Sequence, residues 1–239
     1  ILAASCMMYS CATQTENNPF FTKFQTPNGV PPFDKIKLEH YEPAFQKGVE
    51  EQNANILAII NNTEAPTFEN VIAALDNSSP MLDRVGGVFH NMTEAETTDG
   101  LTELSIKLAP ALSEHGDNIY LNQDLFKKVN AVYQQKESLG LNTEQQRLLE
   151  KQYKDFVRSG ANLSEDKQGR LREINKQLST LSITFSNNIL NENNDFKLFV
   201  DKKEDLIGLP ESFCQSAAQE AQANGQDGKW LFTLHNASR

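Results

Sequence analysis

Basic residues and cysteines are scarce in this chain, and each scarcity excludes a class of protein. The 239 residues hold 22 lysines and arginines against 32 aspartates and glutamates, which gives a formal net charge of −10 at pH 7. This balance argues against nucleic acid and against an anionic membrane surface as the main partner. Two of the three cysteines, Cys6 and Cys11, lie in an apolar leader, so Cys214 has no partner for an intramolecular disulfide. The fold must therefore be stabilised by packing rather than by disulfides.

Several motifs that carry chemistry are also missing. None of the four histidines, His40, His90, His115 and His235, is followed by glutamate or lies four residues from another, so the zinc-binding HExxH motif is absent. The chain has no P-loop, no dinucleotide-binding GxGxxG and no GxSxG elbow. His40 and His115 could reach a metal only through space, so we interpret both as hydrogen-bonded structural histidines. We therefore assign no catalytic residue and no metal ligand within these 239 residues.

The opening residues 1–11 resemble the tail of a secretory signal peptide or lipoprotein leader, because they are apolar and small and polar residues follow. The basic region that begins such a signal is missing before Ile1, so we expect the front end to be clipped. Cys11 follows a small serine and directly precedes the polar residues, which predicts lipid attachment at Cys11. Cys6 is the competing site, and an ordinary signal peptide or an apolar N-terminus without an export role are the alternatives. The predicted location is the cell envelope of a bacterium, either periplasmic or anchored by lipid, with no other membrane contact.

Apolar residues recur at helical spacing along most of the chain, which predicts a mainly α fold. We expect residues 12–38 to form a polar tether and an extended, proline-rich arm, and residues 39–239 to form a helical region that is incomplete at its C-terminus. No later stretch approaches the roughly 20 apolar residues that a membrane span requires. Six helices are predicted in the first part of that region, over residues 39–61 and from Pro66, Ser79, Asp99, Asn122 and Thr143.

Two local patterns make sharper predictions about these helices. Thr143 and Gln146 match a capping box, in which each side chain accepts a hydrogen bond from the other residue's backbone N–H. The same helix is expected to end at Gly160. Gly86 and Gly87 interrupt a helical pattern, which predicts that a neighbouring helix packs closely against them.

A long helix is predicted from Ser164, because one apolar stripe continues through it at spacings of 3, 4, 3, 4 and 4 residues. The stripe consists of Leu171, Ile174, Leu178, Leu181, Phe185 and Ile189. We expect these side chains to be buried in the core rather than to form a coiled coil, which needs a longer regular repeat. On that interpretation Leu181→Ala would cost ~2–5 kcal/mol of stability by creating a cavity.

A small β element is predicted near residues 196–200 and 229–234, where apolar and polar residues alternate. A short helix from Glu211 to about Ala223 should lie between the two strands. Cys214 falls in that helix with no histidine nearby in sequence, so we interpret it as a small buried hydrophobe rather than a nucleophile. A lone strand pair is marginal by itself, so we expect more chain to follow Arg239.

An ordered series of short segments gives the chain a family resemblance. The opening segments Asn18-Pro19-Phe20-Phe21, Val30-Pro31-Pro32-Phe33-Asp34 and His40-Tyr41-Glu42-Pro43-Ala44-Phe45 closely resemble the N-terminal opening of dipeptidyl carboxypeptidases and oligopeptidase A, in the thimet oligopeptidase family of zinc metallopeptidases. The likeness continues in the same order over residues 18 to 235. Its later segments include Pro66-Thr67-Phe68-Glu69-Asn70, Glu144-Gln145-Gln146-Arg147-Leu148-Leu149, Leu206-Ile207-Gly208-Leu209-Pro210 and Trp230-Leu231-Phe232-Thr233-Leu234. Asn236-Ala237-Ser238 departs from the family, whose members tend to carry a proline before the serine.

The resemblance implies that this chain is the helical N-terminal part of a two-lobed, monomeric peptidase with a deep channel. The intact enzyme would use zinc, whose HExxH helix and third ligand, a glutamate, lie downstream of this segment. The resemblance therefore carries over no catalytic or metal-binding residue, and the segment alone should bind no zinc and cleave no peptide. The expected substrates are short peptides, from which C-terminal dipeptides are released. An oligopeptidase that cleaves internally and a non-enzymatic, exported helical binding module are the alternatives.

Overall fold

The computed structural model describes residues 17–96 and 98–235, and these fall into two units that meet within a long helix, between Thr180 and Leu181. Each unit is described by itself. The predicted leader over residues 1–11 and its Cys11 lie outside the described residues. In the part of the chain that is described, no helix combines the length and the apolar character needed to cross a membrane.

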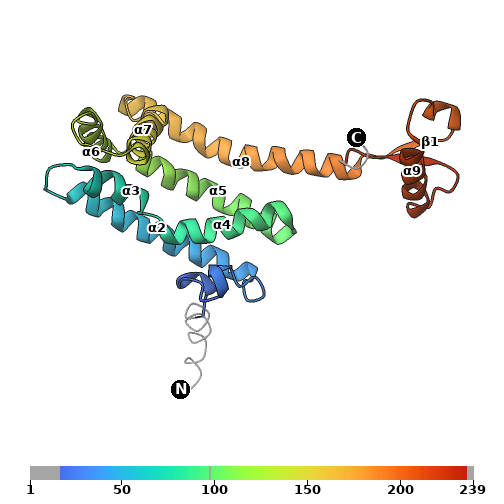
Figure 1. Ribbon diagram of the computed structural model, residues 1–239, viewed down its shortest axis with the longest axis horizontal. Coiled ribbons are helices and arrows are strands. Elements are labelled where there is room, and N and C mark those ends of the chain that lie inside the picture. Colours follow the sequence, from blue (N-terminus) through green and yellow to red (C-terminus); the bar gives the residue numbers. More distant parts are fainter. Residues whose placement is uncertain (1–16, 97, 236–239) are drawn as a thin grey trace, which may run out of the picture. The chain divides into compact units, whose positions relative to one another are not determined.

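The first unit is built from helices (Figure 1). Two short 3₁₀ turns, Pro19–Phe21 and Pro27–Gly29, precede the first long helix, and a π-helical turn at Phe68–Ala73 continues into α3. The helices are α2 (Leu38–Asn61), α3 (Ala74–Asp76), α4 (Pro80–Ala95), α5 (Asp99–Tyr120), α6 (Gln123–Gln134), α7 (Thr143–Arg158) and the first part of α8 (Glu165–Asp195). The predicted mainly α fold is confirmed.

The helix starts follow the sequence signals closely, and two of the capping residues lie one position before the predicted ones. Pro80 occupies the first turn of α4, and the Asn122 side chain accepts hydrogen bonds at the start of α6, both as predicted. At α7 the capping box is formed by Asn142 and Gln145, with N···O distances of 2.9 and 3.0 Å, and the prediction of Thr143 and Gln146 was wrong. Asparagine caps a helix at least as well as threonine, and its amide oxygen takes the same role. At α5 the cap is Thr98 rather than Asp99.

Helix α7 ends at a glycine with a positive φ. Gly160 has a φ of 98°, a conformation that glycine adopts without steric cost. Its N–H donates to the carbonyl of Val157 at 3.2 Å, and the next N–H, from Ala161, donates to the carbonyl of Phe156 at 3.0 Å. These two bonds form a Schellman motif, which satisfies carbonyls that the helix leaves free. The predicted end of this helix at Gly160 is confirmed.

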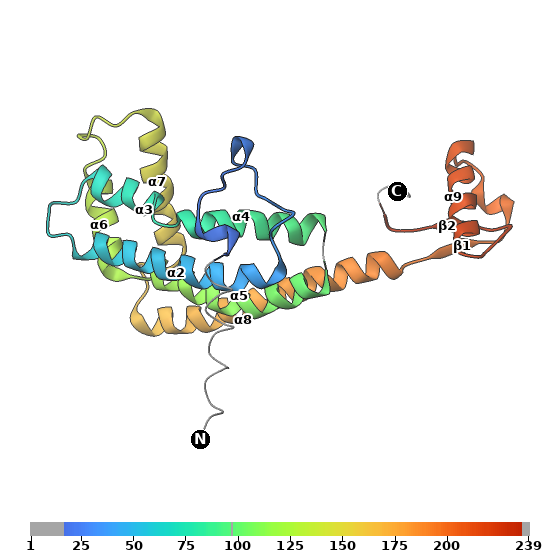
Figure 2. The same cartoon turned by 90° about the horizontal axis from the view of Figure 1, so that it is seen from below.

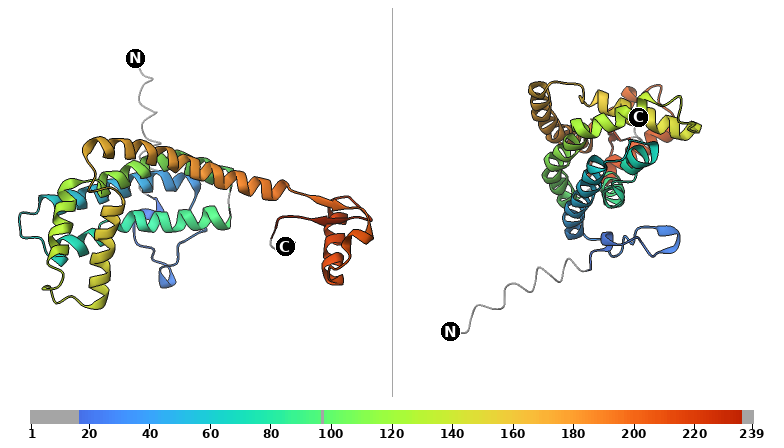
Figure 3. Two further views of the ribbon diagram at one scale, coloured as in Figure 1. Left: turned by 90° about the horizontal axis from the view of Figure 1, so that it is seen from above. Right: turned by 90° about the vertical axis from the view of Figure 1, so that its left-hand side faces the viewer.

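Two hydrophobic clusters form the core of the first unit, and α2 contributes to both. Near its start, Tyr41 and Phe45 pack with residues of α4 and α5. Near its end, Ile56 and Ile59 pack with the π-helical turn, α6 and α7. Two of the opening segments that carry the family resemblance meet in the first cluster, where the rings of Phe20 and Tyr41 have centroids 5.3 Å apart. Between these segments, residues 22–37 loop out beyond α2 and α4 (Figure 3).

Helices α2 and α4 lie side by side (Figure 2), and Gly48 is the residue of α2 that permits their close approach. A Cβ atom at this position would lie 2.9 Å from Cδ2 and Cγ of Leu82 and 3.1 Å from its backbone nitrogen. The prediction that Gly86 and Gly87 serve this purpose was wrong. A Cβ on Gly86 would meet only a ring atom of His90 at 3.9 Å, and one on Gly87 would have no neighbour within 4 Å.

The second unit contains the rest of α8, strand β1 (Leu198–Val200), a 3₁₀ turn (Lys203–Leu206), helix α9 (Glu211–Ala223) and strand β2 (Trp230–Phe232). The strands pair antiparallel, with Phe199 opposite Leu231. The predicted β element and the helix between its strands are confirmed. Cys214 is half-buried rather than buried, and lines a cavity of about 460 Å³ together with Trp230.

The expectation that the apolar stripe of the long helix is buried was wrong. Leu178, Leu181 and Phe185 are 52%, 60% and 66% exposed, and of the six side chains only Leu171 is half-buried. Two polar side chains of α8 form hydrogen bonds with α5. Asn175 Nδ2 donates to Asp117 Oδ1 at 2.7 Å, and Arg172 Nη1 donates to the side chain of Asn118 at 2.8 Å. In this chain Leu181→Ala therefore creates no cavity, and its predicted cost does not apply.

Substitution of Gly48 tests the contact between α2 and α4. We expect Gly48→Ala to lower the free energy of unfolding by about 1–3 kcal/mol, because the added methyl overlaps Leu82 and its backbone. Chemical denaturation followed by circular dichroism measures the change.

Gly87→Ala is the matched control, since Gly87 also lies inside a helix but has open space around it. Its expected effect is a gain of about 0.5–1 kcal/mol from improved helix propensity. Equal effects of the two substitutions would show that close packing at Gly48 does not limit the fold.

Candidate functional site

The structure assigns a local structural role to His40, one of the two histidines considered as metal ligands. Its Nδ1 accepts a hydrogen bond of 3.0 Å from the backbone N–H of Lys37 at the start of α2. Its backbone carbonyl accepts a second bond, of 2.8 Å, from the Asn18 side chain. The interpretation of His40 as a hydrogen-bonded structural residue is confirmed.

His115 lies instead at a cavity of about 450 Å³ in the first unit. The cavity is bounded by α2, α3, the start of α4, α5 and α7. It is the candidate site in this chain because it joins the buried imidazole of His115 to the buried amide of Gln152 and the half-buried amide of Gln52. Its polar lining includes Gln52, Asp76, Ser79, Asp83, His115, Lys151, Gln152 and Asp155.

A hydrogen-bond network fixes the imidazole in this cavity. Gln52 Nε2 donates to the hydroxyl of the fully buried Ser78 at 3.0 Å, which leaves Gln52 Oε1 as an acceptor. His115 Nε2 lies 2.7 Å from that oxygen and donates to it. Asn55 Nδ2 donates to the Ser78 carbonyl at 2.8 Å. The network therefore connects α2 with α5 and with the turn before α4, and His115 is confirmed as a hydrogen-bonded structural histidine.

Burial sets the charge of this imidazole. His115 is 8% exposed, and desolvation lowers its pKa below the ordinary value for histidine. The carboxylates of Asp76, Asp83 and Asp155 line the same cavity, and burial is the cause of the lowered pKa. The imidazole is therefore neutral at pH 7, in the tautomer that carries its proton on Nε2.

Gln152 contributes a buried acceptor that has no donor. Its Nε2 donates to the carbonyl of Ile72 at 3.1 Å, while its Oε1 is buried and makes no hydrogen bond to any described residue. An unpaired buried polar atom costs about 1–3 kcal/mol. A water molecule or a ligand with a hydrogen-bond donor would remove that cost.

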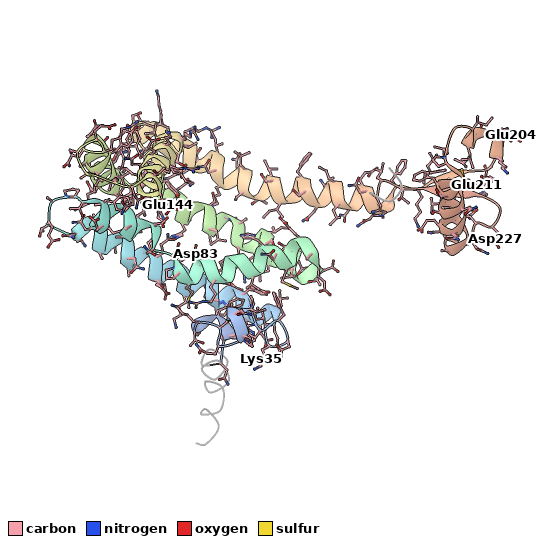
Figure 4. All side chains as sticks on the ribbon, viewed as in Figure 1. Lys35, Asp83, Glu144, Glu204, Glu211 and Asp227 are labelled. Atoms are coloured by element: carbon pink, nitrogen blue, oxygen red, sulfur yellow. The ribbon has the colours of Figure 1, made fainter. Side chains whose placement is uncertain are left out.

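The charged groups of the cavity are mostly acidic. Asp76, Asp83 and Asp155 face one cation, Lys151, whose Nζ lies 2.6 Å from Asp155 Oδ2. The hydrogen bond to Asp155 raises the pKa of the Lys151 ammonium group. Asp83 projects from the first turn of α4 (Figure 4). The acidic side chains of this cavity suit small cations or other hydrogen-bond donors. The hydrogen-bond network at His115, by contrast, connects helices.

The described residues show no cluster of metal ligands. Within residues 17–96 and 98–235, no three side chains of histidine, cysteine, aspartate or glutamate are grouped so that they could hold a metal ion. His40 and His115 lie in separate hydrogen-bonded settings, and the structure does not bring them together. The lipid attachment predicted for Cys11 stays a prediction, as does its alternative at Cys6.

Gln152 and Gln52 were missed by the sequence analysis, although one of them had a usable signal. Gln152 lies three residues after Leu149 and four before Phe156, and both of these side chains are fully buried. A polar residue in register with an apolar stripe is a candidate for a buried, bonded side chain. Gln52 carried no such signal, because its role depends on the position of Ser78.

Comparison with curated proteins finds similarity over almost the whole chain. Dipeptidyl carboxypeptidase of Escherichia coli (strain K12) is 39% identical over 225 residues, which are 94% of this chain and 33% of that protein. Oligopeptidase A of Haemophilus influenzae is 32% identical over 206 residues, which are 86% of this chain and 30% of that protein. Saccharolysin of Saccharomyces cerevisiae is 28% identical over 164 residues. No family model matches the chain.

The chain is a homologue of these peptidases. This finding confirms the resemblance to dipeptidyl carboxypeptidase and oligopeptidase A of the thimet oligopeptidase family, which the segments from Asn18 to Leu234 predict. The chain spans about a third of the length of the curated relatives that it matches.

Replacement of His115 tests the effect of its buried imidazole on acid stability. Because the folded-state pKa is lowered, the unfolded chain binds a proton near pH 6.5 while the folded chain does not. Protonation of His115 therefore has no effect on stability above that pH, and it favours unfolding as the pH falls below it. We expect the midpoint of urea unfolding of His115→Gln to decrease less than that of the wild type between about pH 7 and pH 5.

His90→Gln is the control, since His90 is an exposed histidine of α4. Its unfolding midpoint should follow the pH profile of the wild type. Parallel wild-type and His115→Gln profiles would contradict a buried, neutral imidazole at this position.

Proposed function

We propose that this chain is the N-terminal portion of a zinc-dependent oligopeptidase that hydrolyses short peptides and releases C-terminal dipeptides. The observation that carries this proposal is the 39% identity to Escherichia coli dipeptidyl carboxypeptidase over 94% of the chain. The homologues are peptidases, which supports peptides as the substrates. The intact protein is proposed to act as a monomer.

The catalytic groups are proposed to lie in the part of the protein beyond this chain. The described side chains do not fit a resident zinc ion, because they offer no group of three ligands and the imidazoles of His40 and His115 are used in separate structural bonds. In peptidases of this chemistry, zinc polarises the scissile carbonyl and activates a water molecule. The contribution of this chain would be a rigid helical wall that restricts the substrate to short, unfolded peptides.

Internal cleavage is the second candidate, and a specific observation supports it. Oligopeptidase A of Haemophilus influenzae matches 86% of the chain at 32% identity. This identity is only moderately below the 39% found for the dipeptidyl carboxypeptidase. Residues that capture a free C-terminus would distinguish the two modes, and we place them outside this chain. The downstream reading frame gives a direct check of either peptidase, since both require an HExxH motif there and a non-enzymatic binding module does not.

The proposed activity is tested by incubating the intact protein with a peptide substrate and identifying the products by mass spectrometry. With a short peptide whose N-terminus is blocked, we expect stepwise loss of dipeptides from the C-terminus, abolished by a zinc chelator. The blocked N-terminus excludes aminopeptidase activity.

A folded globular protein serves as the second substrate in the same assay, and we expect it to stay uncut. Internal cuts in the short peptide would replace the dipeptidase proposal with that of an oligopeptidase. Rapid digestion of the folded substrate would contradict the proposed restriction to short peptides.

We further propose that the mature protein is held at the bacterial cell envelope by acylation of Cys11. The support is the position of Cys11 between a small apolar leader and a polar stretch. Two acyl chains on one cysteine provide the stable anchoring that a single chain cannot.

Detergent phase partitioning of the protein expressed in a bacterium tests this anchor. We expect the wild type and Cys214→Ser to partition with detergent, and Cys11→Ser to move to the aqueous phase. A Cys11→Ser protein that stays with the detergent would reject Cys11 and indicate Cys6. A wild-type protein found only in the aqueous phase would reject lipidation.

A further inference from the structure

Helix α8 carries an apolar face that the described residues do not cover. Its exposed members are Ile174, Leu178, Leu181, Phe185 and Ile189, which we call the α8 stripe. Their spacing of 4, 3, 4 and 4 residues places them on one side of the helix. Single exposed apolar residues are ordinary on protein surfaces, but a continuous row of five is typical of an interaction surface.

Within the first unit, the side-chain hydrogen bonds from α8 to α5 come from residues outside the α8 stripe. Asn175 and Arg172 bond to Asp117 and Asn118 of α5, and these two α8 residues lie outside the row of exposed apolar positions. Burial of apolar area is worth about 25 cal/mol per Å², so a helix normally turns such a face inward. In α8 the five residues of the α8 stripe stay exposed instead, which leaves them for another surface.

The charges around the α8 stripe indicate what kind of surface covers it. No aspartate, glutamate, lysine or arginine occurs from Gln177 to Asn191, although 23% of the whole chain is charged. Depletion of charge is typical of the buried centre of a protein–protein contact. A helix that lies on a membrane surface is rich in lysine and arginine, and Lys176 is the single basic residue between Glu173 and Asp195. A coiled coil with a second copy would use flanking charges to set its pairing, and this segment has none.

The length of the homologues indicates which surface covers the α8 stripe. The chain spans about a third of the curated relatives that it matches, so about two thirds of a protein of that length lies outside it. We propose that the part of the intact protein beyond this chain packs on the α8 stripe and buries Leu181 and Phe185. This inference rests on the proposed function only in taking the chain as a portion of a longer peptidase.

Thiol labelling at two positions of α8 tests the proposal. Phe185→Cys places a thiol on the α8 stripe, and Lys176→Cys, nine residues earlier, places one on about the opposite side of the helix. Each is made in this chain and in the intact protein, with Cys6, Cys11 and Cys214 replaced by serine. Both wild-type side chains are exposed in this chain, so both thiols should react rapidly there with a water-soluble maleimide.

In the intact protein we expect the Phe185→Cys thiol to react at least about ten-fold more slowly than in this chain, because it becomes accessible only when the contact opens. The Lys176→Cys thiol should change by less than about three-fold. Leu178→Cys repeats the measurement within the α8 stripe if the intact Phe185→Cys protein does not fold.

Equal labelling of Phe185→Cys in the two proteins would overturn the proposal. So would protection that rises with protein concentration in this chain alone, because that result would assign the α8 stripe to a second copy. Labelling requires no activity, so the inference and the proposed function fail separately. An intact protein that protects Phe185→Cys but cleaves no peptide would contradict only the function.

Discussion

The close contact of α2 with α4 is the constraint on which the rest of the first unit depends. Helix α2 supplies Phe45 to one hydrophobic cluster and Ile56 to the other, so its position sets the geometry of both. Gly48 lies between these residues, where a methyl group would meet Leu82 at 2.9 Å. A change in the separation of the two helices would therefore disturb both clusters, although they share few other elements.

The polar network beside that contact adds specificity to it. Gln52 lies one turn after Gly48 and joins Ser78 to His115, so three segments must be in register for all the bonds to form. Apolar side chains tolerate small shifts, whereas a buried amide or imidazole without its partner costs stability. The cluster contacts thus provide most of the burial, and this network selects one arrangement of the helices.

Local signals in the sequence predicted the elements well, because caps and periodicity act over a few residues. Pro80 and Asn122 start helices where the sequence analysis placed them, and Asn142 replaced Thr143 as a cap because both can fill the same role. The exposure of Leu181 was not predictable in the same way. Periodicity shows which residues share a face of a helix, but what covers that face depends on chain that is distant in sequence.

The apolar stripe of α8 differs from the stripes of α5 and α7 both in its pattern and in its exposure. Two polar positions in the first unit, His115 and Gln152, interrupt apolar stripes and turn out to be buried, whereas the uninterrupted stripe through Leu181 and Phe185 is exposed. A pattern without polar interruption is suited to a surface that fills completely with apolar side chains. The similarity to the peptidases extends over 94% of this chain. The exposed stripe of α8 and the buried stripes of α5 and α7 therefore differ in what must cover them, which the spacing of their apolar residues alone does not show.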